Sequence, residues 1–299
     1  MAPLPPGSAA GSSAGRLVLA ATPIGNLGDA SQRLRDLLAE ADVIAAEDTR
    51  TARRLCQGLG VTPVGRLMAH HEHNEEASAR GLLEQVRAGA TVVMVSDAGM
   101  PTVSDPGYRL VAAAVAEGIP VTCAPGPSAV TTALALSGMP TDRFAFDGFL
   151  PRKDGDRRRR FEEIRGEART VVYFESPQRI AGALALLAQT LGPQRPVCVA
   201  RELTKLHEEV VRGSAEEVLA WAREREASQV GIRGEIVLVV GPASAADEAE
   251  DVSEADAVAE VGVLVDSGTR LKEAVAAVAS AHGLRSRDLY QAVLAARAG

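Results

Sequence analysis

The chain has few aromatic residues, few cysteines and no long apolar run, and each shortage excludes a class of protein. Aromatic residues make up only 3% of the 299 residues, so an aromatic platform for stacking nucleic-acid bases is not expected. No run approaches the roughly 18 apolar residues of a membrane span, and we expect a cytoplasmic protein without membrane contact. The odd, widely spaced cysteines Cys56, Cys123 and Cys198 favour reduced thiols over disulfides or a metal cage, and no metal is implied.

Two phosphate-binding signatures are also missing. The turn after the first apolar run contains Gly25 and Gly28, with Pro23 before them, but no G-x-G-x-x-G pattern. A P-loop lysine is absent from it as well. Phosphate binding at this turn is therefore not expected.

Charge is unevenly distributed along the chain. The net charge is −7, and a stretch from Asp247 to Asp256 holds acidic residues with no base among them, so the remainder is nearly neutral. One dense basic cluster stands out against that background: Arg152, Lys153, Arg157, Arg158, Arg159 and Arg160. Such a run is either a solvated face or a patch that contacts phosphates.

Apolar, β-branched runs alternate with helix-like segments in the first half, which is typical of an α/β fold with a largely parallel sheet. The expected strands are 16–21, 42–46, 91–96 and 119–124. The expected helices between them are 31–41, 49–59, 75–88 and 108–117.

The second half changes character after residue 124. Further strand-like runs are 144–149, 170–174, 197–201, 208–212 and 235–240. Because the last two are joined by a single helical segment, we expect a mixed sheet in a second α/β domain.

These patterns predict a chain of five parts. They are a flexible tail at 1–15, an N-terminal α/β domain at 16–125, a second α/β domain at 126–241, an acidic linker at 242–254 and a helix-turn-helix-like domain at 255–299. Acidic and basic residues are balanced in the last part, so a nucleic-acid module and a plain three-helix appendage both remain open.

The loop VSDAGMPTVSDPG, at 95–107, is the most informative candidate site. Ligands bind beyond the carboxyl ends of strands in open α/β sheets, and this loop follows the third expected strand. The carboxylates of Asp97 and Asp105 suit a ligand with cationic centres and a ribose, such as S-adenosylmethionine. The alternative is turn chemistry alone, with Asp105 capping the next helix and Pro106 at its first position.

A series of motifs between about Arg16 and Val240 resembles the ribosomal RNA small subunit methyltransferase I family, a branch of the tetrapyrrole methylase-like enzymes. The motifs are TPIGNLGD (22–29), AEDTR (46–50), HEHNE (71–75), SDAGMPTVSDPG (96–107), PGPSA (125–129), SGMP (137–140), GFLPRK (148–153), ESPQRI (175–180) and RELTK (201–205). The acidic linker and the Ala-rich tail depart from the family pattern.

The resemblance implies a fold, a reaction and a partner. The fold is two α/β domains with the cofactor in the cleft between them, plus a small C-terminal helical domain, assembled as a homodimer. The reaction is S-adenosylmethionine-dependent methylation of the ribose 2′-hydroxyl of a cytidine in the decoding region of 16S rRNA, with the RNA expected within the small ribosomal subunit.

The resemblance also implies which residues contact S-adenosylmethionine. They are Pro23, Ile24, Gly25, Asp97, Ala98, Gly99, Val103, Ser104, Asp105, Ser128 and Ala129, with Glu175, Leu203 and Gly234 as further contacts.

Methyl transfer to a hydroxyl needs an in-line acceptor and a base that takes the hydroxyl proton. Glu47 and Asp48, beside Arg50, are the first candidates for acceptor positioning or proton removal, and Lys205 is the second. The alternative for Glu47 to Arg50 is a helix cap with an ion pair. His71 and His73 are expected in a solvated or RNA-facing loop rather than a metal site.

Two other functions remain open on the same motifs. One is a methylase of a small tetrapyrrole, and the other is an RNA-binding protein that has lost the chemistry. RNA recognition is expected to rest on shape, on phosphate contacts from the basic cluster, and on the loops around Arg50 and His71.

Overall fold

The computed structural model describes residues 15–71, 75–228, 231–243, 254–281 and 284–298. The expected tail and acidic linker therefore lie outside the described residues, apart from their ends. Contacts divide the chain into two units. The first comprises Met1–Thr132 together with Glu202–Glu208, and the second comprises Ala133–Arg201 together with Glu209–Gly299.

The first unit is built on a five-stranded parallel sheet. The strands are β1 (Arg16–Ala20), β2 (Val43–Ala46), β3 (Arg66–Ala69), β4 (Thr91–Val95) and β5 (Val121–Ala124). Their order in the sheet is β3-β2-β4-β1-β5, and every neighbouring pair runs parallel. All carboxyl ends therefore meet at one edge of the sheet.

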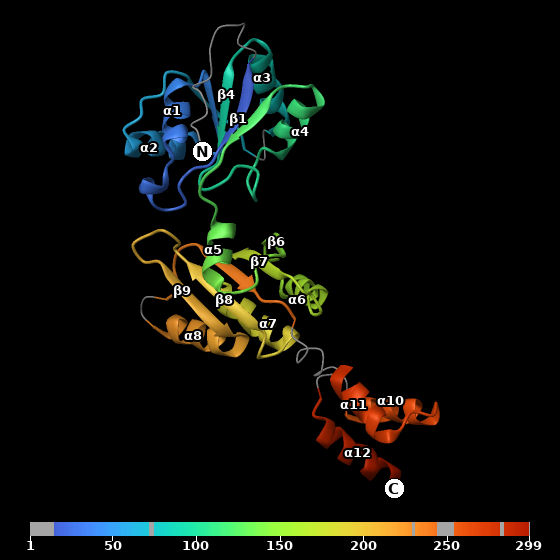
Figure 1. Ribbon diagram of the computed structural model, residues 1–299. Coiled ribbons are helices and arrows are strands. Elements are labelled where there is room, and N and C mark those ends of the chain that lie inside the picture. Colours follow the sequence, from blue (N-terminus) through green and yellow to red (C-terminus); the bar gives the residue numbers. More distant parts are fainter. Residues whose placement is uncertain (1–14, 72–74, 229–230, 244–253, 282–283, 299) are drawn as a thin grey trace, which may run out of the picture. The chain divides into compact units, whose positions relative to one another are not determined.

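Helices cover both faces of this sheet (Figure 1). A short 3-10 turn, η1 (Leu27–Asp29), precedes α1 (Gln32–Glu40), and α2 (Thr49–Leu59), α3 (Glu75–Arg87) and α4 (Tyr108–Ala116) follow. Apolar side chains of α1 and α2 pack on one face, and those of α3 and α4 pack on the other. Each fully buried leucine, such as Leu34 or Leu82, contributes about 1.5–3 kcal/mol relative to exposure.

Two details of the first unit differ from the sequence prediction. Strand β3 was not expected, because its four residues, Arg-Leu-Met-Ala, lack β-branched side chains and lie at an exposed sheet edge. The alternative considered for the loop at 95–107, in which Asp105 caps α4 with Pro106 at the first position, is wrong. The N-cap is Gly107, and it makes no side-chain cap hydrogen bond.

The second unit has a mixed sheet, as predicted. Its strands are β6 (Phe144–Phe149), β7 (Thr170–Glu175), β8 (Pro196–Arg201), β9 (Glu209–Ser214) and β10 (Ile236–Val240), in the order β6-β7-β10-β8-β9. Strands β6 and β7 are parallel, whereas β10 is antiparallel to both β7 and β8, and β9 is antiparallel to β8.

Three helices build the core of the second unit. They are α6 (Asp154–Glu163), α7 (Ile180–Leu191) and α8 (Ala215–Ala227), whose apolar residues pack against β7, β8 and β10. Helix α5 (Ala129–Ser137) contains the division between the two units. The fully buried Arg195 donates to the carbonyls of Gly241 and Arg165, both at 2.9 Å. It thereby connects the residue after β10 with the segment after α6.

The C-terminal helices form a small cluster of their own. Helices α10 (Glu254–Asp266), α11 (Leu271–Ala281) and α12 (Ser286–Ala298) bury Val261, Val275, Val278, Leu289 and Val293 against one another. The expected α/β architecture with a C-terminal helical part is thereby confirmed. None of the described helices is both long and apolar enough to cross a membrane.

Candidate cofactor and catalytic site

Two loops at the carboxyl edge of the first sheet are joined by backbone hydrogen bonds. Thr22, just after β1, donates its N–H to the carbonyl of Gly99 at 2.9 Å, and Gly99 donates back at 3.1 Å. The Thr22 side chain is fully buried and donates to the carbonyl of Ser96 at 3.3 Å. The loop after β4 is therefore fixed against the loop after β1.

Glycines allow three segments to approach one another at this edge. A Cβ on Gly25 would lie against the Cγ of Lys205 and 2.9 Å from the carbonyl oxygen of Leu203. A Cβ on Gly126 would lie 3.0 Å from the Cβ of Ala21. The segment Glu202–Glu208 thus packs on the loop after β1, which explains why it belongs to the first unit.

Backbone strain is concentrated in two of these segments. Among the described residues, positive φ angles at non-glycine positions occur at Thr102 (74°), Ser104 (62°), Glu202 (52°) and Thr204 (66°). Each such residue costs of order 1–3 kcal/mol and persists only where its surroundings impose it, typically at functional sites. The strained positions fall in the loop after β4 and in the segment that carries Lys205.

Burial, with the charges of neighbouring carboxylates, raises the pKa of three carboxylates near the ends of β2 and β4. Burial raises the pKa of Asp105 to about 6, with a contribution from the charge of Asp97. Burial also raises the pKa of Glu47, as do the charges of Asp105, Asp97 and Asp48. The pKa of Asp97 is raised mainly by burial, and its Oδ1 accepts from the Asp48 N–H at 3.2 Å. A cationic ligand would relieve this repulsion.

Asp48 and Arg50 form a different arrangement from Glu47. Asp48 is the N-cap of α2 and accepts from the Arg50 N–H at 2.7 Å, while the Arg50 guanidinium pairs with the same carboxylate at 2.8 Å. Hydrogen bonds from Arg50 lower the pKa of Asp48 to about 2. The alternative for this motif was a helix cap with an ion pair. Asp48 and Arg50 form both, but Glu47 takes part in neither.

Lys205 is held in a tightly bonded turn. Its ammonium lies 2.8 Å from Glu202 Oε1, and its N–H donates to the Glu202 carbonyl at 3.0 Å. Glu208 accepts from the Thr204 N–H at 2.6 Å. The turn presents Lys205 beside Gly25 in a defined position.

Ser128 and Ala129 lie where α5 begins. The Ser128 carbonyl accepts the first helical bond, from the N–H of Thr132 at 3.0 Å. The first N–H groups of a helix have no partner within it and attract anions. The start of α5 is therefore suited to an anionic group, in contrast to the carboxylates of the neighbouring loops.

Two expected cofactor contacts belong to the second unit. Glu175, the last residue of β7, is buried and accepts from the Ser176 N–H at 2.6 Å and from Arg179 at 2.5 Å. Its Oε2 is buried without a hydrogen-bond partner among the described residues. Gly234 is exposed, has a φ of 92°, and precedes β10, whose first residue Ile236 pairs with Glu175.

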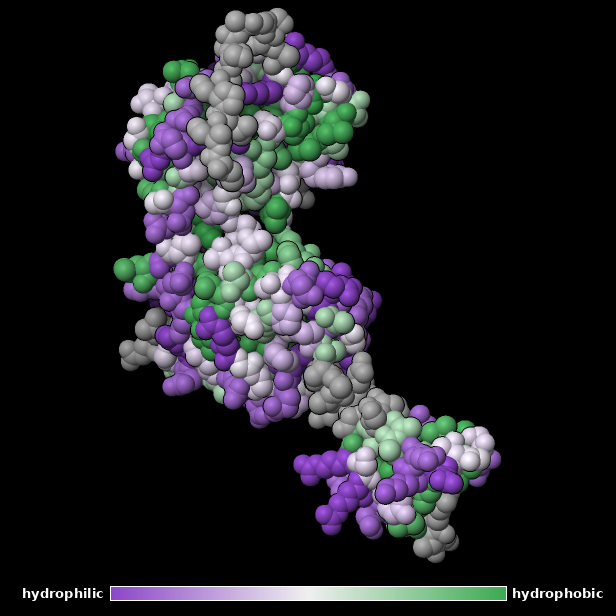
Figure 2. All heavy atoms as spheres, in the orientation of Figure 1, coloured by the Kyte–Doolittle hydropathy of each residue, from purple (hydrophilic) through white to green (hydrophobic). Residues whose placement is uncertain are grey.

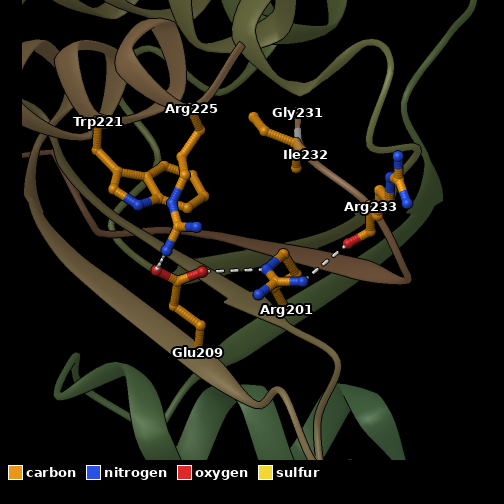
Figure 3. Close-up of a pocket in the computed structure, with 7 residues that line it drawn as sticks. All are labelled: Arg201, Glu209, Trp221, Arg225, Gly231, Ile232 and Arg233. Carbon is orange, nitrogen blue, oxygen red and sulfur yellow. Dashed lines mark hydrogen bonds and ion pairs between the residues drawn. The ribbon is translucent and has the colours of Figure 1, made fainter. Parts of the chain in front are cut away.

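A small hollow of about 40 Å³ lies at the same edge of the second sheet, where β8 ends and β9 begins. In Figure 3 the carboxylate of Glu209 lies between the guanidinium groups of Arg201 and Arg225, at 3.1 and 2.6 Å, with Trp221 beside Arg225. Arg201 also donates to the Arg233 carbonyl at 3.0 Å. These cations bond to groups of the protein itself, and none of the predicted site residues lines this hollow.

The basic cluster begins just before α6 and continues along it. The surface there is strongly hydrophilic (Figure 2). Arg157 does not share this exposure, because it is only 3% exposed and donates to the carbonyls of Pro151 and Arg152. Arg159 pairs with Asp156, and Arg160 pairs with Asp147 and Glu163.

The remaining members of the cluster, Arg152, Lys153 and Arg158, are exposed, and no ion pair joins them to another described residue. The prediction that Arg157 contacts RNA is therefore not supported by its position, since its guanidinium is enclosed by its own unit.

The sequence prediction missed three residues that shape the site. Thr22 and Ser96 connect the loops, with Ser96 Oγ donating to the Gly99 carbonyl at 3.2 Å. Thr22 and Ser96 begin the motifs TPIGNLGD and SDAGMPTVSDPG, in which only the residues that follow them were predicted as cofactor contacts. Glu75 accepts hydrogen bonds from the start of α4, a role that no local pattern indicates. His73 lies outside the described residues, and within the described ranges no cluster of His, Cys, Asp and Glu is suited to a metal ion.

Comparisons with known proteins agree with this architecture. The family model of the tetrapyrrole (corrin/porphyrin) methylases matches residues 16–219, which is more than half of the chain. The uroporphyrin-III C-methyltransferase of Thermus thermophilus, solved with S-adenosyl homocysteine, is 22% identical, with a TM-score of 0.52 over 76% of this chain and 97% of that chain. A cobalt precorrin-4 methyltransferase is 18% identical, with a TM-score of 0.54 over 79% and 98%. These structures show the shared fold.

Curated sequences of much higher identity give a narrower family. The ribosomal RNA small subunit methyltransferase I of Mycobacterium tuberculosis is 50% identical over 286 residues, covering 95% of this chain and 96% of the relative. The protein of the same name from Escherichia coli O157:H7 is 41% identical over 285 residues, with the same coverage. The chain therefore belongs to the ribosomal RNA small subunit methyltransferase I family, within the tetrapyrrole methylases.

Proposed function

We propose that the protein transfers a methyl group from S-adenosylmethionine to the ribose 2′-hydroxyl of a cytidine in the decoding region of 16S rRNA. The observation that carries the proposal is the carboxylate cluster of Glu47, Asp97 and Asp105 at the carboxyl edge of the first sheet, in a chain of this family. The proposal includes the assembled small ribosomal subunit as substrate and a homodimer in the cytoplasm, as the family resemblance implies.

The residues of the first unit fit S-adenosylmethionine by their chemistry. The cluster of raised-pKa carboxylates suits the positive ammonium and sulfonium groups, and the start of α5 at Ser128 and Ala129 suits the carboxylate. Gly99, with a φ of 80°, brings backbone rather than side chain to the site. The contacts we propose in the first unit are Pro23, Ile24, Gly25, Asp97, Ala98, Gly99, Val103, Ser104, Asp105, Ser128, Ala129 and Leu203.

When bound, S-adenosylmethionine supplies a methyl carbon attached to positively charged sulfur. That methyl group would be transferred to the ribose oxygen, whose proton must be taken by a base. Glu47 takes the hydroxyl proton. Because its pKa is raised by burial and by neighbouring carboxylates, Glu47 is a stronger base than Asp48, whose pKa is lowered to about 2.

Lys205 and Arg50 have supporting roles in this proposal. Glu202 holds the Lys205 ammonium in a fixed position, at 2.8 Å from its carboxylate. In this proposal the positive charge of Lys205 attracts an RNA phosphate near the acceptor. Arg50 pairs with Asp48, the N-cap of α2, and its side chain is largely exposed. It can therefore contact RNA that approaches from the solvent. Arg152, Lys153 and Arg158 contribute further phosphate contacts from the second unit, joined by Arg159 and Arg160 when these leave their surface ion pairs.

The test is methyl transfer from labelled S-adenosylmethionine to small ribosomal subunits from cells that lack this protein, followed by mass mapping of the modified nucleosides. The expected product is one 2′-O-methylcytidine in the decoding region, formed by the natural protein and not by Glu47→Gln. Transfer to a precorrin instead of RNA would replace the proposal with small-molecule methylation. RNA binding without cofactor binding would replace it with a non-catalytic role.

A further inference from the structure

Glu75, the first residue of α3, has no part in the proposed chemistry but is buried, which is uncommon for a carboxylate. It belongs to the HEHNE motif and is 9% exposed. Its Oε1 accepts from the N–H of Gly107 at 3.0 Å and from the N–H of Arg109 at 3.2 Å. Gly107 is the N-cap of α4, and Arg109 is its second residue. The carboxylate therefore satisfies N–H groups that otherwise have no partner within the helix.

Helix α4 requires a cap from elsewhere in the chain. An N-cap side chain normally accepts from the first turn, but Gly107 has none. A Cβ at this position would collide with the Cε of Met94 and lie 2.6 Å from its Sδ, and the φ of Gly107 is 121°. Because a φ of 121° disfavours any residue with a side chain at this position, the acceptor comes from another element, and Glu75 supplies it.

The capped position is also the end of the loop that carries Asp97 and Asp105. One point of that loop is bonded to Thr22 through Gly99, and the other end is bonded to Glu75 through Gly107. Between them lie Thr102 and Ser104 with φ angles of 74° and 62°. A strained segment keeps its shape only while both ends are held.

We infer that Glu75 is a positioning residue for the cofactor site: by capping α4 from α3, it holds the loop after β4 in the shape that places Asp105. This inference rests on the proposed function, because it assigns a cofactor to that loop. Asp105 lies two residues before Gly107, so loss of the cap releases the segment closest to the carboxylate cluster.

The geometry indicates that the hydrogen-bond acceptor matters more than the ion pair. Both backbone N–H groups donate to Oε1. The Arg109 side chain is largely exposed, and its Nε stays 3.7 Å from Oε2, which makes a long ion pair. An exposed ion pair of this kind contributes little. Glutamine at position 75 would keep an oxygen acceptor at the same place, whereas alanine would remove it.

The chain offers a matched control at the other ends of the same two helices. Arg87 near the end of α3 pairs with Glu117 at the end of α4, far along both helices from the loop. Glu117→Ala therefore removes a bond between α3 and α4 without touching the cap. Arg109→Ala removes the ion pair of Glu75 while retaining the backbone N–H groups.

The experiment measures S-adenosylhomocysteine binding by calorimetry, well below each variant's unfolding temperature, together with hydrogen exchange of the Gly107 and Arg109 amides. Glu75→Ala should raise the Kd about tenfold and speed exchange at both amides, because two charge-assisted bonds are lost. Glu75→Gln, Arg109→Ala and Glu117→Ala should stay within about threefold of the natural protein.

Two results would overturn the inference. One is a natural Kd in Glu75→Ala with only a lower unfolding temperature, which would make the cap purely structural while leaving the proposed function intact. The other is no binding by the natural protein, which would remove the proposed function as well. If Glu75→Ala does not fold, Glu75→Asp withdraws the acceptor by one methylene and should show the same weakened binding, and a natural Kd there would also count against the cap.

Discussion

At the carboxyl edge of the first sheet, burial and the charges of neighbouring carboxylates raise the pKa of Glu47, Asp97 and Asp105, whereas in the second unit Glu209 is held between Arg201 and Arg225. The second unit also satisfies its buried Arg195 with backbone carbonyls. A charge that is paired within the fold stabilises it or costs little. Carboxylates that lie close to one another cost stability, and such groups with raised pKa are typical of ligand sites. The comparison therefore distinguishes charged residues available for a ligand, in the first unit, from charged residues that stabilise the fold, in the second.

The largest expected effect comes from removing the base of the first unit. Glu47→Gln should lower kcat by about 10²–10⁴-fold, the usual contribution of a general base. Folding should be unharmed, because the substitution removes a repelled charge. Single-turnover methylation of small subunits measures the effect, with Asp48→Asn as the comparison. A kcat within threefold of the natural protein would assign proton removal to another group.

Breaking the buried network of the second unit should instead reduce stability. Arg195→Met leaves the carbonyls of Gly241 and Arg165 without their donor, at a cost of about 3 kcal/mol. Urea unfolding measures this change, and Arg158→Met on the exposed face of α6 is the control, with little effect expected. At a temperature where Arg195→Met remains folded, its S-adenosylhomocysteine affinity should be unchanged; a large loss of affinity would connect the two regions.

Neutralising Asp105 should stabilise the protein without cofactor. The folded-state pKa of about 6 lies above the ordinary 3.8, so the folded protein prefers the protonated acid and loses stability as pH rises from about 4 to about 6. Asp105→Asn removes this loss and should gain about 1 kcal/mol at pH 7 after allowance for solvent screening, with no gain at pH 4. Thermal unfolding at both pH values checks it; a lower midpoint at pH 7 would mean that the carboxylate is compensated within the fold.

The smallest effect is expected where ion pairs are partly exposed. Burial alone would raise the pKa of Glu209, but hydrogen bonds from Arg225 and Arg201 hold it below its ordinary 4.5. Its contribution is therefore present above that value and is lost as pH falls through the lowered pKa. Glu209→Gln should cost about 0.5–1 kcal/mol at pH 7 and less at pH 3. An equal cost at both pH values would assign the effect to packing.

Local pattern was enough to predict most strands and the loops at the carboxyl edge of the first sheet, where we propose the site. Runs such as Thr-Val-Val-Met-Val at β4 are β-branched and buried, and they end in Gly- and Asp-rich turns that predict a ligand edge. Strand β3 lacks those features, since its place in the sheet depends on pairing with β2 rather than on its own residues.

Interactions between distant residues account for what local pattern did not predict. The cap of α4 comes from Glu75, about thirty residues earlier, and nothing in the turn Ser104–Gly107 reveals it. Arg157 looks like its exposed neighbours in sequence but lies on the inner side of α6. Likewise, Glu47 and Asp48 are adjacent in the chain, yet only Asp48 meets Arg50.

The central claim is that the uncompensated carboxylates of the first unit bind the cationic methyl donor. The most direct measurement is the Kd of S-adenosylmethionine at pH 5 and pH 7.5 for the natural protein and for Asp105→Asn. With a pKa of about 6 for Asp105, the natural Kd should fall about tenfold as pH rises over this range, because only the ionised form binds the cation well, and that of Asp105→Asn should remain flat. A natural Kd that does not change over this range would contradict the claim.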